Sequence, residues 1–292
     1  MKKIIAITLT LALSLALLAA CGGNSETTES PTNTPNGTGT PTNNFDTNQA
    51  IHVITRESGS GTRGAFEDMF DIDISGQATI IQSTGGVREA VAGDIRAISY
   101  ISLGSMRPEV RAVNIDGAAA TVENIVSGEY GIFRPFLLAH QDDLSDAAQD
   151  FLNFILSAEG QEIINNGFIG TVDGALPFES NGATGRVEVD GSTSVGPLMA
   201  QLREAYLAIR PDANIQLNEG GTGAGINGAI EGNVDLGMAS RDLRATEDIG
   251  YTLIALDAIA VIVHPDNPIT NLTSEQVATI FGETNTRWSD VF

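Results

Sequence analysis

The sequence predicts an α/β protein of two lobes, and three features lead to this fold class. About 240 residues follow a leader and a polar stretch, which is enough chain for two lobes of ordinary size. Short β-branched segments alternate with amphipathic segments, as in folds that pack helices on a sheet. Several of these strands lead into their helices through loops rich in glycine, serine and threonine, a pattern typical of anion-binding helix starts.

The first twenty residues have the pattern of a secretory signal peptide. Lys2 and Lys3 precede an apolar run over residues 4–18, which is too short to span a membrane comfortably. The run ends in Leu-Ala-Ala-Cys, which resembles the bacterial lipobox, and Cys21 is the only cysteine. Because a lone thiol cannot form an intrachain disulfide, we expect a lipid on Cys21 that anchors the protein to the extracytoplasmic face of the cell membrane. Residues 21–49 are mostly Gly, Asn, Ser, Thr and Pro, so we expect a disordered tether.

The chain is strongly acidic, with a formal net charge of −22. Removal of the leader would take away both lysines and leave 13 arginines against 37 acidic residues. This balance argues against nucleic acid or an anionic lipid surface as a partner, since both attract clustered basic side chains. A bound anion must therefore be held by local donors rather than by long-range attraction.

The periodicity of the remaining chain predicts alternating strands and helices. In the first half we expect strands at 51–55, 97–103 and 136–139, and helices at 64–70, 86–92 and 145–165. In the second half we expect strands at 186–189, 214–217 and 234–238, with helices that end near residues 209 and 231. Helix 145–165 has the apolar stripe of one long amphipathic helix.

Four loops carry the residues with binding chemistry, and their sequences are GSTSV, GGTGAG, ASR and RESGSGTR. A helix N-terminus presents free N–H groups and a partial positive charge, so glycine and hydroxyl residues there suit an oxyanion. One hydroxyl before a helix is more often a plain cap. The joint occurrence of these loops with Arg56, Arg63 and Arg241 indicates an oxyanion site, because guanidinium groups bind tetrahedral oxyanions through paired donors.

Several segments resemble the phosphate-binding proteins of ABC phosphate importers. They are VITRESGSGTRGAFE, VDGSTSVGPL, EGGTGAGI, VDLGMASRDL, ALDAIAVIVHPDNPITNLTSEQVATIFG and TNTRWSDV, and the resemblance covers nearly the whole domain after the tether. It implies a type II periplasmic-binding-protein fold, with two lobes and a two-stranded hinge. It also implies a solute-binding protein rather than an enzyme, without metal or cofactor, that delivers inorganic phosphate to the permease subunits of an ABC importer. The phosphate contacts that it implies are Thr193, Ser194, Thr222, Ser240, Arg241, Arg56, Ser60, Gly61 and Thr62.

The order of these segments differs from the usual order in the family. The GSTSV half normally precedes the RESGSGTR half, whereas here it follows, so the sequence resembles a circular permutant. Lobe B would then combine residues 50–131 and 264–292, and lobe A would be continuous over residues 132–263. An alternative is a domain-swapped dimer, in which the C-terminal segment pairs with the first strand of another chain.

The anion and the physiological role stay open at this point. Sulfate or molybdate could replace phosphate, and a cell-surface phosphate sensor or scavenger is an alternative to transport. A site that prefers hydrogen phosphate to sulfate needs a carboxylate that accepts the proton. Candidates for that acceptor are Glu57, Asp190, Glu219 and Asp257.

Two other classes of function are less well supported by the residues. Residues 223–228 satisfy the dinucleotide pattern G-x-G-x-x-G, but an exported protein seldom meets NAD. A secreted serine hydrolase would need a histidine base beside a serine. The three histidines, His52, His140 and His264, belong to no recognisable catalytic or metal motif.

Overall fold

The structure is a computed structural model that describes residues 45–283 and 286–291. The predicted signal peptide, Cys21 and most of the predicted tether lie outside the described residues. Within the described part, every helix is too short or too polar to cross a bilayer.

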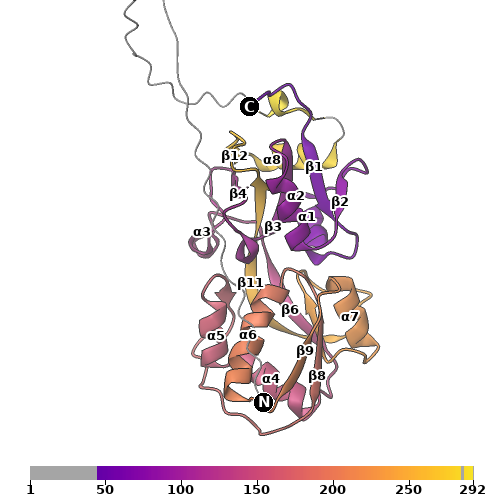
Figure 1. Ribbon diagram of the computed structural model, residues 1–292, viewed down its shortest axis with the longest axis vertical. Coiled ribbons are helices and arrows are strands. Elements are labelled where there is room, and N and C mark those ends of the chain that lie inside the picture. Colours follow the sequence, from indigo (N-terminus) through magenta and orange to yellow (C-terminus); the bar gives the residue numbers. More distant parts are fainter. Residues whose placement is uncertain (1–44, 284–285, 292) are drawn as a thin grey trace, which may run out of the picture. The chain divides into compact units, whose positions relative to one another are not determined.

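A sheet of ten strands runs through the described chain (Figure 1). Its strands are β1 (His52–Arg56), β2 (Thr79–Ile81), β3 (Ala97–Ser102), β4 (Arg111–Ala112), β6 (Phe133–His140), β7 (Ile169–Gly170), β8 (Arg186–Gly191), β9 (Asn214–Leu217), β10 (Leu236–Ala239) and β11 (Gly250–Val263). The order is β2-β1-β3-β11-β6-β10-β8-β9, and β4 and β7 also pair with β11. Strands β5 (Asn114–Ile115) and β12 (Asn271–Leu272) form a separate parallel pair.

Helices cover this sheet in two groups, each around its own hydrophobic core. The helices are α1 (Gly61–Phe70), α2 (Thr84–Ala92), α3 (Val122–Ser127), α4 (Asp146–Leu156), α5 (Ala158–Ile164), α6 (Gly196–Ile209), α7 (Thr222–Ile230) and α8 (Ser274–Gly282), with 3-10 turns η1 (Leu103–Ser105) and η2 (Trp288–Asp290). The core of lobe B joins β1, β3 and the end of β11 to α1, α2 and α8. The core of lobe A joins β6, β8 and β10 to α4, α5 and α6. The predicted α/β fold is confirmed.

Alternation along β6 explains how lobe A is covered on both faces. Phe136 and Leu138 belong to the core under α4, α5 and α6. Leu137 and Ala139 point the other way and pack against α7, because successive side chains of a strand face opposite sides.

The chain passes between the lobes twice, and β11 makes the sheet continuous across this boundary (Figure 1). The first part of β11 pairs with β6 of lobe A, and Ile259 to Val263 pair with β3 of lobe B. At this boundary the N–H of Ile259 donates to the carbonyl of Ile132, the point at which the chain enters lobe A. Lobe A therefore ends near Asp257, a few residues before the boundary that the sequence analysis places at Val263.

The C-terminal segment pairs with the start of the described chain. Ala50 and Arg287 form an antiparallel bridge. Trp288 is fully buried, and its ring centroid lies 5.7 Å from that of Phe45. Residues 45–49 thus belong to the folded part rather than to the predicted tether, and the pairing that a domain swap would make between chains occurs within one chain. Adjacent ends are what a circular permutation requires, and the permutation itself stays a prediction.

The predicted long helix over residues 145–165 is wrong in one respect, because it is two helices. Ser157 has an extended backbone between α4 and α5, with ψ 171°. Its hydroxyl donates to the carbonyl of Phe154 at 2.7 Å and accepts from the N–H of Gly160 at 3.3 Å. A Cβ on Gly160 would lie 2.8 Å from the carbonyl carbon of Ile155, so α5 packs too closely on the end of α4 for any side chain there. The apolar periodicity continues across this break and hides it from sequence inspection.

Candidate functional site

Four helices begin where the two lobes meet. Helices α1 and α2 start in lobe B after β1 and β2, and α6 and α7 start in lobe A after β8 and β9. Each of these two pairs of strands is parallel, so the loops after the strands lie at one edge of each half of the sheet. The N-termini of all four helices thereby present N–H donors in the same region.

Hydroxyl groups from the two lobes contact one another between these helix starts. Thr62 Oγ1 lies 2.8 Å from Ser194 Oγ. Thr84 Oγ1 lies 3.1 Å from both Thr193 Oγ1 and Ser194 Oγ, and the N–H of Thr84 donates to Thr193 Oγ1 at 3.2 Å. These four side chains are buried. Hydroxyls suit such a meeting point, because each can donate one hydrogen bond and accept two.

Arg56 brings a guanidinium group to these hydroxyls. Its Nη1 donates to Thr84 Oγ1 and its Nη2 donates to Thr193 Oγ1, both at 3.1 Å. Its Nε and Nη2 donate to the two carboxylate oxygens of Glu57 at 2.9 and 2.7 Å. Arg56 is only 2% exposed, so Glu57 supplies the counter-charge that a buried guanidinium needs.

Ser192, Thr222 and Ser240 extend this set of hydroxyls within lobe A. The hydroxyl of Ser192 donates to Ser240 Oγ at 2.8 Å, and the N–H of Ser240 donates to Thr222 Oγ1 at 3.3 Å. Gly61 of lobe B lies against them, since a Cβ there would be 2.7 Å from Ser240 Oγ and closer still to Thr222 Oγ1. Glycine at position 61 is therefore required by the close approach of the lobes. We name as the hydroxyl cluster the residues Thr62, Thr84, Ser192, Thr193, Ser194, Thr222 and Ser240.

Two of the residues predicted as contacts have other roles in the structure. The hydroxyl of Ser60 accepts from the N–H of Arg63 at 3.3 Å and caps α1. The guanidinium of Arg241 does not face the hydroxyl cluster but donates to both oxygens of Glu247 at 2.8 and 2.7 Å. These bonds hold the pKa of Glu247 below its usual range. The side chain of Arg241 also packs across the lobe boundary, with its Cδ 3.4 Å from a Cβ built on Gly64.

Arg134 and Asp257 form a buried ion pair where the chain crosses between the lobes. Arg134 Nη2 lies 3.2 Å from Asp257 Oδ2, and the hydroxyl of Ser102 donates to Asp257 Oδ1 at 2.9 Å. Arg134 Nη1 donates to the carbonyl of Ser240 at 3.0 Å, which ties this pair to the hydroxyl cluster. Burial raises the pKa of Asp257 to about 6, against the opposing effects of Arg134 and Ser102. Burial also lowers the pKa of Arg134.

Comparison with known proteins places this chain in a family. A model of a PBP superfamily domain matches residues 38–159 and 178–292. The phosphate-binding protein PstS 2 of Streptococcus agalactiae serotype V is 38% identical over 257 residues, with 82% of this chain and 87% of the relative covered. PstS 2 of Streptococcus pneumoniae serotype 4 is 39% identical over 254 residues, with the same shares covered. The chain belongs to the PBP superfamily, in the family of these phosphate-binding proteins.

A solved structure of this family has the same fold. It is a phosphate ABC transporter, phosphate-binding protein from Streptococcus pneumoniae TIGR4, and it superposes with a TM-score of 0.67 at 38% identity. The superposition covers 84% of this chain and all of that chain. The family resemblance drawn from the motifs is confirmed, whereas these matches leave the proposed permutation of the chain as a prediction.

Three residues of the site were not predicted from the sequence, namely Thr84, Ser192 and Arg134. Thr84 stands between Ser83 and two glycines, so it has the same hydroxyl and glycine pattern as the other loops. Helix α2 starts at Thr84, two residues before the predicted helix start at residue 86. Ser192 lies within the GSTSV loop itself. Arg134 has no local signal, because its bond to Ser240 depends on the pairing of β6 with β10.

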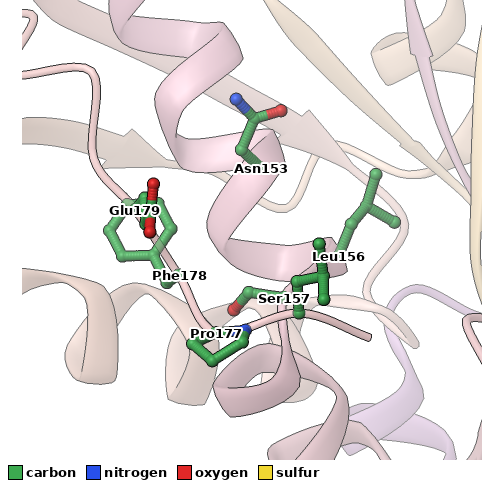
Figure 2. Close-up of a pocket in the computed structure, with 7 residues that line it drawn as sticks. Asn153, Leu156, Ser157, Pro177, Phe178 and Glu179 are labelled. Atoms are coloured by element: carbon green, nitrogen blue, oxygen red, sulfur yellow. The ribbon is translucent and has the colours of Figure 1, made fainter. Parts of the chain in front are cut away.

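A separate pocket of about 580 Å³ lies in lobe A, between the end of α4 and residues 176–179 (Figure 2). Its lining residues are Asn153, Leu156, Ser157, Leu176, Pro177, Phe178 and Glu179. Ser157 is already used as a helix cap, and the N–H of Phe178 is bound by Glu159. The lining shares no residue with the hydroxyl cluster, so this pocket is not part of the candidate site.

Proposed function

We propose that this chain binds inorganic phosphate between its two lobes and delivers it to the permease subunits of an ABC importer. The observation that carries the proposal is the meeting of hydroxyls from both lobes around the buried guanidinium of Arg56. A tetrahedral oxyanion accepts many hydrogen bonds from donors of this kind. The relatives at 38% and 39% identity, which are named as phosphate-binding proteins, support the same ligand.

Binding would proceed by closure of the lobes. The anion meets the donors of one lobe first, and closure adds those of the other lobe and expels water, which strengthens each hydrogen bond. From lobe B act Arg56, Thr62 and the N–H of Gly61. From lobe A act Thr193, Ser194, Thr222 and Ser240. Arg241 acts indirectly, by packing its side chain against α1. The permease then recognises the closed form.

The binding site is tested by calorimetric titration of the protein with phosphate, with Arg56→Gln as the variant. We expect saturable binding by the wild type and an affinity at least about 30-fold lower for Arg56→Gln, because a charged donor contributes roughly 2 kcal/mol or more. Arg96→Gln is the matched control, since Arg96 is a half-exposed arginine that pairs with Asp94 in lobe B. Equal affinities for Arg56→Gln and wild type, with both proteins folded, would refute the site.

We also propose that Cys21 carries a lipid that holds the protein on the outer face of the cell membrane. The support is the leader pattern of Lys2 and Lys3, an apolar run and Leu-Ala-Ala-Cys. Replacement of Cys21 by Ala should move the protein from the membrane fraction to the soluble fraction. Continued membrane association of Cys21→Ala would count against lipidation.

A further inference from the structure

A chain of buried polar contacts joins lobe B to the hydroxyl cluster. It begins at Ser102 on β3 of lobe B, passes through Asp257 on β11 and Arg134 on β6, and ends at the carbonyl of Ser240 in lobe A. These four residues are at most 1% exposed. Buried polar groups are stable only while each keeps its partner, so a change at one member is felt by the next.

Ser240 depends on Arg134 for the position of its carbonyl. The pairing of β10 with its neighbours ends at Ala239, one residue before Ser240. Arg134 Nη1 donates to the carbonyl of Ser240 at 3.0 Å. The N–H of Ser240 donates to Thr222 Oγ1 at 3.3 Å, and its hydroxyl lies 2.8 Å from Ser192 Oγ. A shift of this carbonyl would therefore move Ser240 relative to Thr222, and both are proposed to bind the anion.

Asp257 fixes the orientation of the Arg134 guanidinium. Its Oδ2 lies 3.2 Å from Nη2 and 3.4 Å from Nε of Arg134. A planar guanidinium that is held by two of its donors has a set direction for the remaining ones. Arg134 Cζ also lies 5.4 Å from the ring centroid of Phe136, which restricts the group further. The donor that reaches Ser240 is thus aimed by Asp257.

Lobe B holds the other oxygen of Asp257. The hydroxyl of Ser102 donates to Oδ1 at 2.9 Å, and the N–H of Gly104 in η1 also stabilises the ionised carboxylate. An ionised carboxylate can accept all of these bonds at once. A protonated one carries an O–H on one oxygen, so it would lose part of its hold on Arg134 or on Ser102.

We propose that Asp257, acting through Arg134, positions Ser240 for the bound anion, and that it does so in its ionised form. Asp257 and Arg134 are positioning residues rather than anion contacts. Since Ser102 of lobe B holds the same carboxylate, this arrangement also links the anion loop of lobe A to lobe B. The role rests on the proposed function, because it presupposes an anion between the lobes.

Three other titratable or charged groups face this ion pair. Tyr130 lies near Asp257, and Tyr100 on β3 and Arg56 on β1 lie near Arg134. Burial raises the pKa of both tyrosines, that of Tyr100 to about 12, and arginine side chains stay charged at neutral pH. Burial raises the pKa of Asp257 itself to about 6. A titration of this pair between pH 5 and pH 8 is therefore that of Asp257.

The test is calorimetric titration of wild type and Asp257→Asn with sodium phosphate at pH 5, 6, 7 and 8 and constant ionic strength. At pH 8 the variant should bind about tenfold more weakly, because an amide offers Arg134 a neutral acceptor in place of a charged one. The ratio of the two dissociation constants should fall to about two at pH 5, where Asp257 of the wild type is mostly protonated. This ratio is free of the titration of phosphate itself, which is common to both measurements.

A ratio near one at pH 8, or a ratio that does not change with pH, would overturn the positioning role of Asp257 alone. Absence of phosphate binding by the wild type would overturn the proposed function as well. Ser102→Ala removes the donor in lobe B and keeps the ion pair, and it should weaken phosphate binding about threefold or more at pH 8. This milder variant decides the question where Asp257→Asn does not fold, since wild-type affinity in it would contradict the role.

Asp150→Asn is the matched control. Asp150 is also a fully buried carboxylate in an ion pair, with its Oδ2 2.9 Å from Arg210 Nη1. Its other partners are Ser180, Asn181 and Tyr206, and none of them belongs to the hydroxyl cluster. Phosphate affinity of this variant should stay within about twofold of the wild type at each pH, since a distant site is independent. Equal losses in Asp150→Asn and Asp257→Asn would show general damage and refute the positioning role.

Discussion

Thr84 shows how a single hydroxyl serves both lobes. Its Oγ1 lies 3.1 Å from Arg56 Nη1, from Thr193 Oγ1 and from Ser194 Oγ. One hydroxyl has a single proton to give and can accept two hydrogen bonds. Arg56 uses one accepting position, so the proton of Thr84 is available to either lobe A hydroxyl or to an anion between them.

Replacement of Thr84 by Val tests this role, because valine keeps the shape of threonine and loses the hydroxyl. We expect phosphate affinity to fall about 5- to 30-fold, which corresponds to roughly 1–2 kcal/mol for one buried hydrogen bond. Thr84→Ser keeps the hydroxyl and should remain within about threefold of the wild type. Both are measured by calorimetry, and wild-type affinity in Thr84→Val would mean that the hydroxyl only packs the lobes together.

The residues that the sequence could predict are those in a glycine and hydroxyl loop that leads into a helix. Thr193, Ser194 and Thr222 stand in glycine loops before helices, and the structure does place them where the lobes meet. Arg241 is predicted at the anion because a guanidinium group suits an oxyanion and because its loop, ASR, resembles a loop of the family. In the structure Arg241 donates to Glu247, six residues further along the chain. The loop sequence does not show that the chain folds back and places Glu247 beside Arg241.

Among the elements, β6 and β11 carry a buried ion pair. Arg134 on β6 and Asp257 on β11 are 1% and 0% exposed, and the pair has hydrogen bonds to Ser102 and to the carbonyl of Ser240. Removing two charges from water costs several kcal/mol, which their attraction and these bonds offset only in part. The pKa of Asp257 is raised from 3.8 to about 6, because the effect of burial is larger than that of the pairing with Arg134.

The raised pKa of Asp257 predicts a pH-dependent contribution to stability. An acid whose pKa is higher in the folded state favours folding in its protonated form, so this contribution is complete below about pH 4 and is lost as the pH rises through 6. Asp257→Asn imitates the protonated form at every pH. Relative to wild type, the variant should gain on the order of 2–3 kcal/mol in free energy of unfolding between pH 4 and pH 7.

Urea denaturation of both proteins at pH 4, 5, 6 and 7 measures this difference. Asp212→Asn is a control for general charge effects, since Asp212 is an exposed acid whose pKa is lowered by hydrogen bonds from Arg210. A gap between Asp257→Asn and wild type that is constant with pH would mean that Arg134 cancels the effect of burial, and a gap that shrinks as the pH rises would mean that Arg134 outweighs burial.

Element positions were predictable where the apolar period and the turn residues agree. Helix α6 ends at Ile209 as expected, and β9 spans the predicted residues 214–217. The short strands β4, β5, β7 and β12 have two residues each, which is too few to show an alternating apolar pattern in the sequence. They are defined only by their hydrogen bonds to neighbouring strands. The break between α4 and α5 is not visible in the periodicity either, since the close contact that requires Gly160 is set by packing.

For the molecule as a whole, two of the places where the lobes touch bear on closure. One is the hydroxyl cluster, together with the bond from the N–H of Gly223 in α7 to the carbonyl of Gly59 at 3.1 Å. The other lies where η1 of lobe B meets lobe A, with Gly104 against the ring of Phe168. Neither contact could be read from the sequence, because each joins residues far apart in the chain.

The Gly104 contact predicts that closure can be impaired without touching the anion site. A Cβ on Gly104 would lie 2.6 Å from Cε1 of Phe168 and closer still to its Cζ. That ring is nearly buried and packs on Phe136 at 5.5 Å, so it has little room to move. Gly104→Ala should therefore hold the lobes apart and lower phosphate affinity about tenfold or more, although no residue of the hydroxyl cluster is changed.

The double variant Gly104→Ala with Phe168→Leu separates this mechanism from general damage. Leucine is shorter than phenylalanine and leaves space for the added methyl group, so affinity should return toward that of Phe168→Leu alone. The two substitutions would then be strongly non-additive in binding free energy, as expected for residues in direct contact. Additive losses across the four proteins, each checked for folding by thermal denaturation, would show that the Gly104 contact does not govern closure.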